Sequence, residues 1–306
     1  MKHNTEFIQS FMEHYEYPEE AVMLFSEVLV RLDGSKAYSK IFDGLLDKFN
    51  YHQTRIDSKL TTPLGALAVM MGYSYYTLFF VFLLSLTEGL KKQYTLLGVS
   101  EEAYWETMGD LKYKLLECME CKGVPGTFVP DWFDGFFHLN RIAYGRFQYE
   151  VGVYDKDKPF KMKSGHVVNK GDIFIGFHIP SSGEPLTDEV RYASYKKAYE
   201  NLKHFFPDGN VLFGCGSWLL YPRHREFLPE RLNIRRFMDD FEIVDWAEDD
   251  KGFHDIWRVF GKDAKLPYKK LPKDTTLKKA YAEWLCAGNK GGHAFGLFLF
   301  DGEKII

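Results

Sequence analysis

The stretch Asp172-Ile-Phe-Ile-Gly-Phe-His-Ile-Pro180 opens the segment that decides the fold of this 306-residue chain. Its apolar run ends at a proline, which is typical of a buried strand. After the polar residues 181–187, tyrosines and other apolar side chains recur every three or four residues, which predicts a helix that ends before Pro207. A second apolar run over residues 211–220 predicts another strand. A strand, a turn, a helix and a strand form a crossover unit that joins two parallel strands.

The first turn of this unit meets the start of its helix at the carboxyl end of the first strand. That position most readily holds an anionic ligand, because backbone N–H groups converge there. We therefore look for the functional site around His178, which ends the first strand.

The bulk composition is that of an ordinary globular protein, with 45% apolar and 27% charged residues. The length permits two domains, each with its own core. The 39 basic and 43 acidic residues give a net charge of −4, so no basic excess favours nucleic acid or an anionic membrane surface as a partner. Neither partner is predicted.

The four cysteines are too few for a disulfide framework in a chain of this length, which favours a reduced, cytoplasmic location. The first residues lack the apolar core of a signal peptide. Cys118 and Cys121 lie on adjacent helical turns, but no second pair is near them in the sequence to complete a zinc site. No metal is predicted.

Residues 60–87 contain no charged side chain. A membrane-spanning helix needs about 20 apolar residues, so the length alone permits one. Pro63, Gly65 and Gly72 interrupt the run, however, and its densest part, residues 78–86, is much shorter. We therefore predict a pair of buried core helices, with membrane association through residues 78–86 as the alternative.

Two domains are predicted, an all-α domain over residues 1–126 and a mixed α/β domain over residues 127–306. Apolar residues follow helical spacing up to about residue 122, and Ser100 is a good N-cap for the last of these helices. Gly126 ends a turn after which the pattern changes, and an aromatic bridge, residues 128–138, follows. The fold class is therefore α+β.

The second domain is expected to contain six or seven strands. Alternating apolar residues predict a strand over residues 147–154. Residues 242–246 and 255–260 are expected to form paired strands, Thr275 to begin a helix, and residues 293–300 to form the closing strand. Asn233 can cap a short helix before them.

This order of elements resembles the GNAT superfamily of acyl-CoA N-acyltransferases. More narrowly, the chain resembles a bacterial family with a helical N-terminal domain and a GNAT-like C-terminal domain, over nearly its whole length. The residues that carry the resemblance are 145–150, 178–180, 182–183, 215–220, 228–229 and 233–234. The resemblance implies an enzyme that transfers an acyl group from acyl-CoA, its co-substrate, to a small amine or amino sugar.

The resemblance also implies where coenzyme A would bind. Its pyrophosphate would face the turn after the first crossover strand, but here Pro185 removes a backbone donor and Glu184 adds a negative charge. Arg191 or Lys196 would have to compensate. The implied cofactor-binding residues are Phe177, Ile179, Ser181, Ser182, Gly183, Arg191 and Trp218.

Four residues are candidates for catalysis. Acyl transfer to an amine needs a base, and His178 at the strand end or the carboxylate of Glu150 would supply it. The leaving thiolate needs an acid, and Cys215 or Ser217 on the second crossover strand would supply that. Each has a plainer interpretation: a structural histidine, a surface carboxylate, and for Cys215 a small core residue.

A second function stays open alongside the enzyme. A non-catalytic protein that kept the sheet and lost the transfer chemistry would use the same fold to bind a small ligand or a partner. The aromatic bridge would then line its pocket, although aromatic residues at such density also form cores. The sequence leaves the oligomeric state open, with a homodimer as one alternative.

Overall fold

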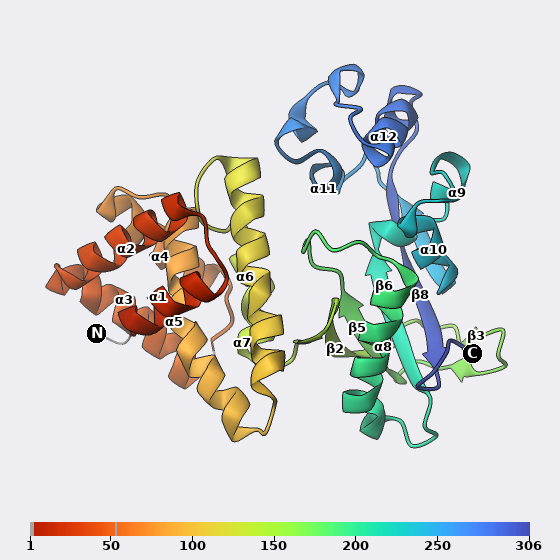
Figure 1. The fold of residues 1–306 in the computed structure, drawn as a ribbon, viewed down its shortest axis with the longest axis horizontal. Coiled ribbons are helices and arrows are strands. Elements are labelled where there is room, and N and C mark those ends of the chain that lie inside the picture. Colours follow the sequence, from red (N-terminus) through yellow and green to blue (C-terminus); the bar gives the residue numbers. More distant parts are fainter. Residues whose placement is uncertain (1–2, 53) are drawn as a thin grey trace. The chain divides into compact units, whose positions relative to one another are not determined.

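The computed structural model describes residues 3–52 and 54–306 (Figure 1). The chain divides into two compact units, Met1–Ile142 and Ala143–Ile306. The sequence prediction placed the domain boundary earlier, after Gly126. The difference arises because the aromatic bridge folds into short helices, and the division groups these with the helical unit.

The first unit is helical, as predicted. Ser100 caps its last long helix, because its Oγ accepts a hydrogen bond of 3.1 Å from the amide of Ala103. The helices are α1 (Thr5–His14), α2 (Glu19–Asp33), α3 (Lys36–His52), α4 (Ser58–Met71), α5 (Tyr75–Leu96) and α6 (Glu101–Lys122), followed by the short η1 (Pro130–Phe133) and α7 (Asp134–Phe137).

The uncharged segment forms α4 and α5, the predicted pair of helices. Gly72, with φ of +75°, ends α4 in the left-handed conformation that favours glycine. Half of the residues of α5 are buried, and Phe80 stacks on Phe25 of α2. Within the described residues, no single helix has the length and hydropathy of a membrane span; α4 and α5 meet those criteria only together, across a bend of 116°.

The second unit contains a six-stranded sheet with the strand order β1-β2-β5-β6-β8-β7 and a separate two-stranded sheet, β3–β4. Its strands are β1 (Ile142–Tyr144), β2 (Phe147–Val153), β3 (Phe160–Lys161), β4 (Val167–Val168), β5 (Ile173–His178), β6 (Val211–Ser217), β7 (Glu242–Glu248) and β8 (Gly292–Phe300). Its longer helices are α8 (Asp188–Leu202), α10 (Asn233–Asp239) and α12 (Thr276–Cys286).

The predicted crossover is present, because β5 and β6 are parallel neighbours joined by α8 (Figure 1). Helices α8 and α10 cover one face of the sheet, which we call the helical face. Phe177 of β5 and Phe213 of β6 point into this layer, where both pack against Tyr195 of α8. Phe237 of α10 also contacts Phe177. Burial of these aromatic rings holds the crossover in place.

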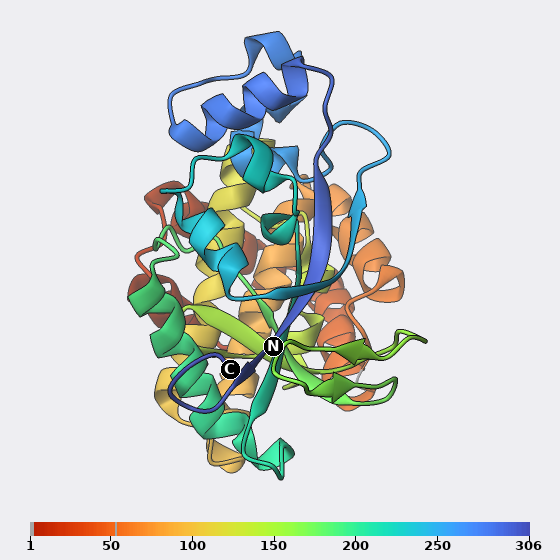
Figure 2. The same cartoon turned by 90° about the vertical axis from the view of Figure 1, so that its right-hand side faces the viewer.

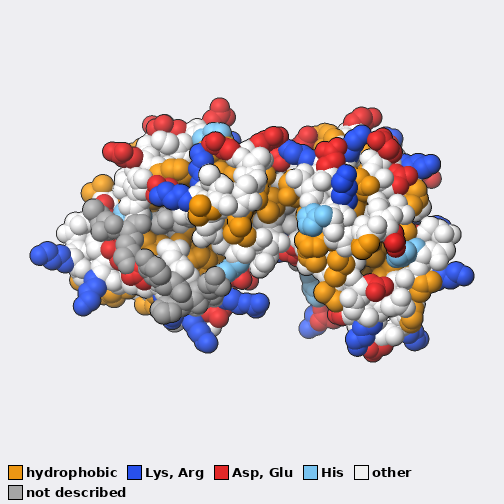
Figure 3. All heavy atoms as spheres, turned by 90° about the horizontal axis from the view of Figure 1, so that it is seen from below, with side chains coloured by type: hydrophobic (Ala, Val, Ile, Leu, Met, Phe, Trp, Pro, Cys, Tyr) orange, Lys and Arg blue, Asp and Glu red, His pale blue; other side chains and the backbone are white. Residues whose placement is uncertain are grey.

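The opposite face of the sheet, which we call the open face, is covered at one end by the β3–β4 hairpin (Figure 2). Phe174 of β5 packs there near Gly214 of β6, where an added Cβ would lie 2.6 Å from its ring. Gly214 is therefore required by packing. The surface view in Figure 3 shows basic and acidic side chains interspersed on the face it presents.

Residues 255–260 do not form the predicted strand. They contain α11 (Ile256–Phe260), and Val259 and Phe260 pack in a cluster with Tyr281 of α12. A short apolar run is compatible with either structure, and packing against a helix decides it here. Asn233 is the first residue of α10 rather than its cap, which is Leu232.

A buried histidine joins the end of β6 to α12. His224 is fully buried; its Nδ1 lies 3.3 Å from the carbonyl oxygen of Leu219, and its Nε2 lies 2.5 Å from the hydroxyl of Tyr281. Burial lowers the pKa of His224 from 6.5 to about 4. The ring is therefore neutral in the folded protein at neutral pH.

This depressed pKa predicts a loss of stability in acid. Between pH 6.5 and about 4 the unfolded chain binds a proton at His224 that the folded chain does not, so the free energy of unfolding falls as the pH falls through this window. The full shift corresponds to about 3 kcal/mol. Denaturant unfolding of wild type and His224→Phe at a series of pH values should give curves that converge toward pH 4. A constant difference across the window would contradict this account.

Candidate functional site

The site lies where β5 and β6 stop pairing. Their registered partners are only Ile175 with Phe213 and Gly176 with Gly214. Beyond these pairs β5 continues along β2 as far as His178, while β6 continues along β8 as far as Ser217. The two parallel strands therefore diverge into a wedge at their carboxyl ends, next to His178.

Two of the predicted catalytic residues meet beside this wedge. Nε2 of His178 lies 2.9 Å from Oε1 of Glu150 on β2, and each side chain is about one-third exposed. Both residues belong to the open face, because Glu150 pairs with Gly176 and His178 pairs with Gln148. The ring nitrogen and the carboxylate oxygen are within hydrogen-bond distance, and imidazole and carboxylate are both groups that enzymes use as bases. The pair is thus suited to take up a proton.

The β6 side of the wedge is open at Gly216. A Cβ added to this glycine would meet no atom within 4 Å, whereas one added to Gly214 would overlap Phe174. Of these two glycines, only Gly216 has space beside its Cα. The backbone of Gly216 is therefore accessible from the open face.

The turn after β5 is held by Arg146, which sequence analysis did not single out. This buried side chain donates from Nη1 to the carbonyl oxygen of Pro180 at 2.9 Å and from Nε to that of Glu184 at 3.2 Å. It thereby ties Pro180, just before the turn that would face a pyrophosphate, to Glu184 in the middle of that turn. The only sequence signal was its place among residues 145–150, which carry the family resemblance.

Within this turn, Gly183 has φ of +80° and is exposed together with Ser181, while Ile179 and Ser182 are partly buried. The hydroxyl of Ser182 accepts a hydrogen bond from the amide of Glu184. Helix α8 begins directly after the turn with two acidic residues. Asp188 forms ion pairs with Arg191 and Arg236, whereas the exposed carboxylate of Glu189 opposes an anion at the helix start. Glu184 and Glu189 thus place negative charge around the turn that would face the phosphates.

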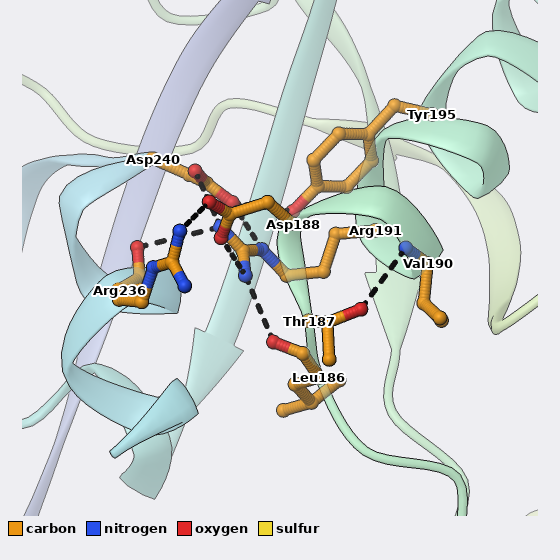
Figure 4. Close-up of polar contacts among 8 residues, drawn as sticks. All are labelled: Leu186, Thr187, Asp188, Val190, Arg191, Tyr195, Arg236 and Asp240. Atoms are coloured by element: carbon orange, nitrogen blue, oxygen red, sulfur yellow. Dashed lines mark hydrogen bonds and ion pairs between the residues drawn. The ribbon is translucent and has the colours of Figure 1, made fainter. Parts of the chain in front are cut away.

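Arg191 does not offer its guanidinium to a phosphate, contrary to the compensation we expected. Its side chain is buried, with Nε 2.7 Å from Oδ2 of Asp240 and Nη1 2.8 Å from the carbonyl oxygen of Leu186 (Figure 4). Nη1 also forms an ion pair of 3.0 Å with Asp188. This network holds α8 against α10. Lys196, the other proposed cation, pairs with Glu303.

Two predicted cofactor-binding side chains lie elsewhere. Phe177 alternates onto the helical face, where it is 3% exposed, so only its backbone borders the wedge. Trp218 packs beside Phe253 and Tyr281 in the cluster built on α12. Phe177 is a core residue and Trp218 is partly buried against that cluster, because strand alternation and the turn after β6 direct them away from the open face.

The structure does not bring Cys215 and Ser217 to the His178–Glu150 pair. Cys215 shares the helical face with Phe213 and is 2% exposed, and burial raises the pKa of its thiol to about 12. The hydroxyl of Ser217 accepts a hydrogen bond of 3.1 Å from the amide of Leu219 and caps a short 3₁₀ turn. The plainer interpretation of Cys215, a small core residue, therefore fits the geometry. Within residues 3–52 and 54–306, no cluster of three or more His, Cys, Asp or Glu side chains is arranged for a metal.

This sheet, with its divergent parallel strands and crossover helix, defines the class of GNAT-like acyltransferase folds. The sequence profile of a GNAT-like C-terminal domain matches residues 141–298, and that of an N-acyltransferase N-terminal domain matches residues 6–139. The chain belongs to the family that joins these two domains. Comparison with curated proteins finds no match.

Solved structures of acyltransferases share the fold. A mutant acyltransferase in complex with octanoyl-CoA superposes with a TM-score of 0.71 at 18% identity, over 96% of this chain and 88% of that chain. An acyltransferase in complex with decanoyl-CoA and teicoplanin gives a TM-score of 0.70 at 17% identity, over 96% and 88%. Another in complex with decanoyl-CoA gives 0.67 at 20% identity, over 95% and 86%.

The role of Arg191 can be tested by stability. Arg191→Met would leave Asp240 buried without its guanidinium partner, which costs about 3–5 kcal/mol in typical proteins. Thermal unfolding should show a clear fall in Tm, and the control Lys196→Met, whose side chain is half exposed, should change little. If the variant instead keeps the wild-type Tm and binds coenzyme A more weakly, Arg191 contacts a phosphate of the coenzyme and the structural role is wrong.

Proposed function

We propose that this protein is an N-acyltransferase that moves an acyl group from acyl-CoA to a primary amine. One observation carries the proposal: the His178–Glu150 pair lies on β5 and β2 just past Gly176, the last residue at which β5 pairs with β6. A base at the mouth of a wedge suited to a pantetheine arm is the arrangement that transfer from a thioester needs.

In the proposed reaction, the amine nitrogen attacks the thioester carbonyl carbon. A C–N bond forms, the C–S bond breaks, and coenzyme A leaves as a thiolate. His178 removes one N–H proton from the attacking nitrogen, Glu150 stabilises the resulting imidazolium, and the proton is then available to the thiolate. Cys215 has no part in this scheme, since it faces the other side of the sheet.

The fold relatives guide the choice of substrates. Acyltransferases of this fold were crystallised with octanoyl-CoA and decanoyl-CoA, and one of them with teicoplanin. We therefore propose octanoyl-CoA as the first donor to test. Teicoplanin and an amino sugar such as glucosamine are the first acceptors.

The histidine pair can be tested by substitution. His178→Gln removes the base and should lower acyl transfer from octanoyl-CoA by about 10²–10⁴-fold, and Glu150→Gln should lower it less. Release of free coenzyme A thiol measures the rate. Because both side chains are about one-third exposed, we expect a Tm within a degree or two of wild type. A large fall in Tm with undiminished turnover per folded molecule would show that His178 is structural.

The wedge can be closed without touching the base. Gly216→Val adds a branched side chain where a Cβ meets no atom, and β-branched residues suit a strand. The fold should therefore tolerate the change, while octanoyl-CoA should bind at least about tenfold more weakly because the valine occupies the path. Calorimetric titration measures this. Equal affinity of wild type and variant would place the coenzyme elsewhere.

The second candidate, a binding protein without transfer activity, is favoured by the acidic start of α8 and by the loss of a donor at Pro185. Both features weaken a phosphate site. Thermal shift with coenzyme A separates the two functions. A protein that neither turns over octanoyl-CoA nor is stabilised by millimolar coenzyme A would be the non-catalytic one.

A further inference from the structure

Gln148 lies next to the proposed base. It is the second residue of β2 and pairs directly with His178 of β5. Directly opposed residues of antiparallel strands project from the same face of the sheet. Glu150, two residues further along β2, shares that face by alternation. Gln148, Glu150 and His178 are therefore three polar side chains on one small area of the open face.

Gln148 differs from the other two in its burial. The residue is 1% exposed, and its Oε1 is buried with no hydrogen-bond partner among the residues that the structure describes. A buried acceptor without a donor destabilises a protein. An unpaired oxygen in this place, beside a base and at the mouth of a wedge, indicates a site that a ligand N–H or O–H completes.

We propose that Gln148 binds the acceptor amine and makes the site selective for primary amines over alcohols. The inference rests on the proposed function. A neutral primary amine carries two N–H groups and one lone pair. The lone pair forms the C–N bond, His178 removes one proton, and Oε1 of Gln148 accepts the N–H that stays in the product amide.

An alcohol cannot satisfy both residues. It carries a single O–H, whose proton His178 must remove, so nothing remains for Gln148 and its buried oxygen stays unpaired in the transition state. Sites that hydrogen-bond one substrate reject an analogue without that group for this reason. The geometry thus gives Gln148 the role of a specificity-determining residue.

The test compares matched acceptors with matched variants. The donor is octanoyl-CoA, the amine acceptors are glucosamine and teicoplanin, and glucose is the alcohol partner of glucosamine. Gln148→Met keeps the length of the side chain and removes its hydrogen bonding, and Gln148→Leu is the second variant. Gln93→Met on the exposed face of α5 is the control.

We expect kcat/KM for the amine acceptors to fall by at least about tenfold in Gln148→Met and Gln148→Leu. The rate with glucose and the KM for octanoyl-CoA should stay unchanged. The ratio of kcat/KM for glucosamine to kcat/KM for glucose should therefore fall. The Tm of the acceptor-free variants should equal or exceed that of wild type, because an unpaired buried oxygen has been removed. The control should behave as wild type.

Three results would overturn the inference while the proposed function stands. The first is an unchanged kcat/KM for the amine acceptors in both variants. The second is a raised KM for octanoyl-CoA with unchanged amine kinetics, which would place Gln148 against the pantetheine amide. The third is a fall in Tm in both variants, which would make the residue structural. A wild-type protein that acylates neither glucosamine nor teicoplanin would overturn both proposals.

Discussion

The divergence of two parallel strands after Gly176 and Gly214 is the constraint on which the site depends. It arises because each strand stays with its other neighbour: β5 remains paired with β2 as far as His178, and β6 remains paired with β8 as far as Ser217. The sheet thus consists of two antiparallel halves joined by a short parallel contact. Pro180 ends β5, since proline has no amide to continue a ladder. Arg146 then holds the turn that follows, so the wedge is set by hydrogen bonds on both of its sides.

Two ion pairs of this unit have different consequences. Arg191 and Asp240 are both buried, and their contact fixes α8 to α10. Removing either partner would leave an unpaired charge in the low-dielectric interior, so the fold depends on the pair for its stability. His178 and Glu150 are partly exposed, so solvent reaches both side chains. Burial thus separates the pair that holds the fold from the pair suited to proton transfer.

Local sequence patterns predicted most of the helices and strands. Contacts between side chains that are distant in the sequence could not be predicted in this way. The crossover followed from the apolar runs around Phe174 and Phe213, and His178 and Glu150 each followed from alternation along a strand. Their contact did not, because the register between β2 and β5 depends on the long excursion through the β3–β4 hairpin. Arg191 was expected to compensate for the altered turn by binding a phosphate. Its actual partner, Asp240, is 49 residues away along the chain.

A crystal structure of the wild-type protein with octanoyl-CoA tests the central claim most directly. The account predicts that the pantetheine arm passes between β5 and β6 beside Gly216, with the thioester carbon within reach of an amine held by His178. Electron density for the coenzyme outside the wedge, or strands β5 and β6 paired through their full length in the complex, would contradict it.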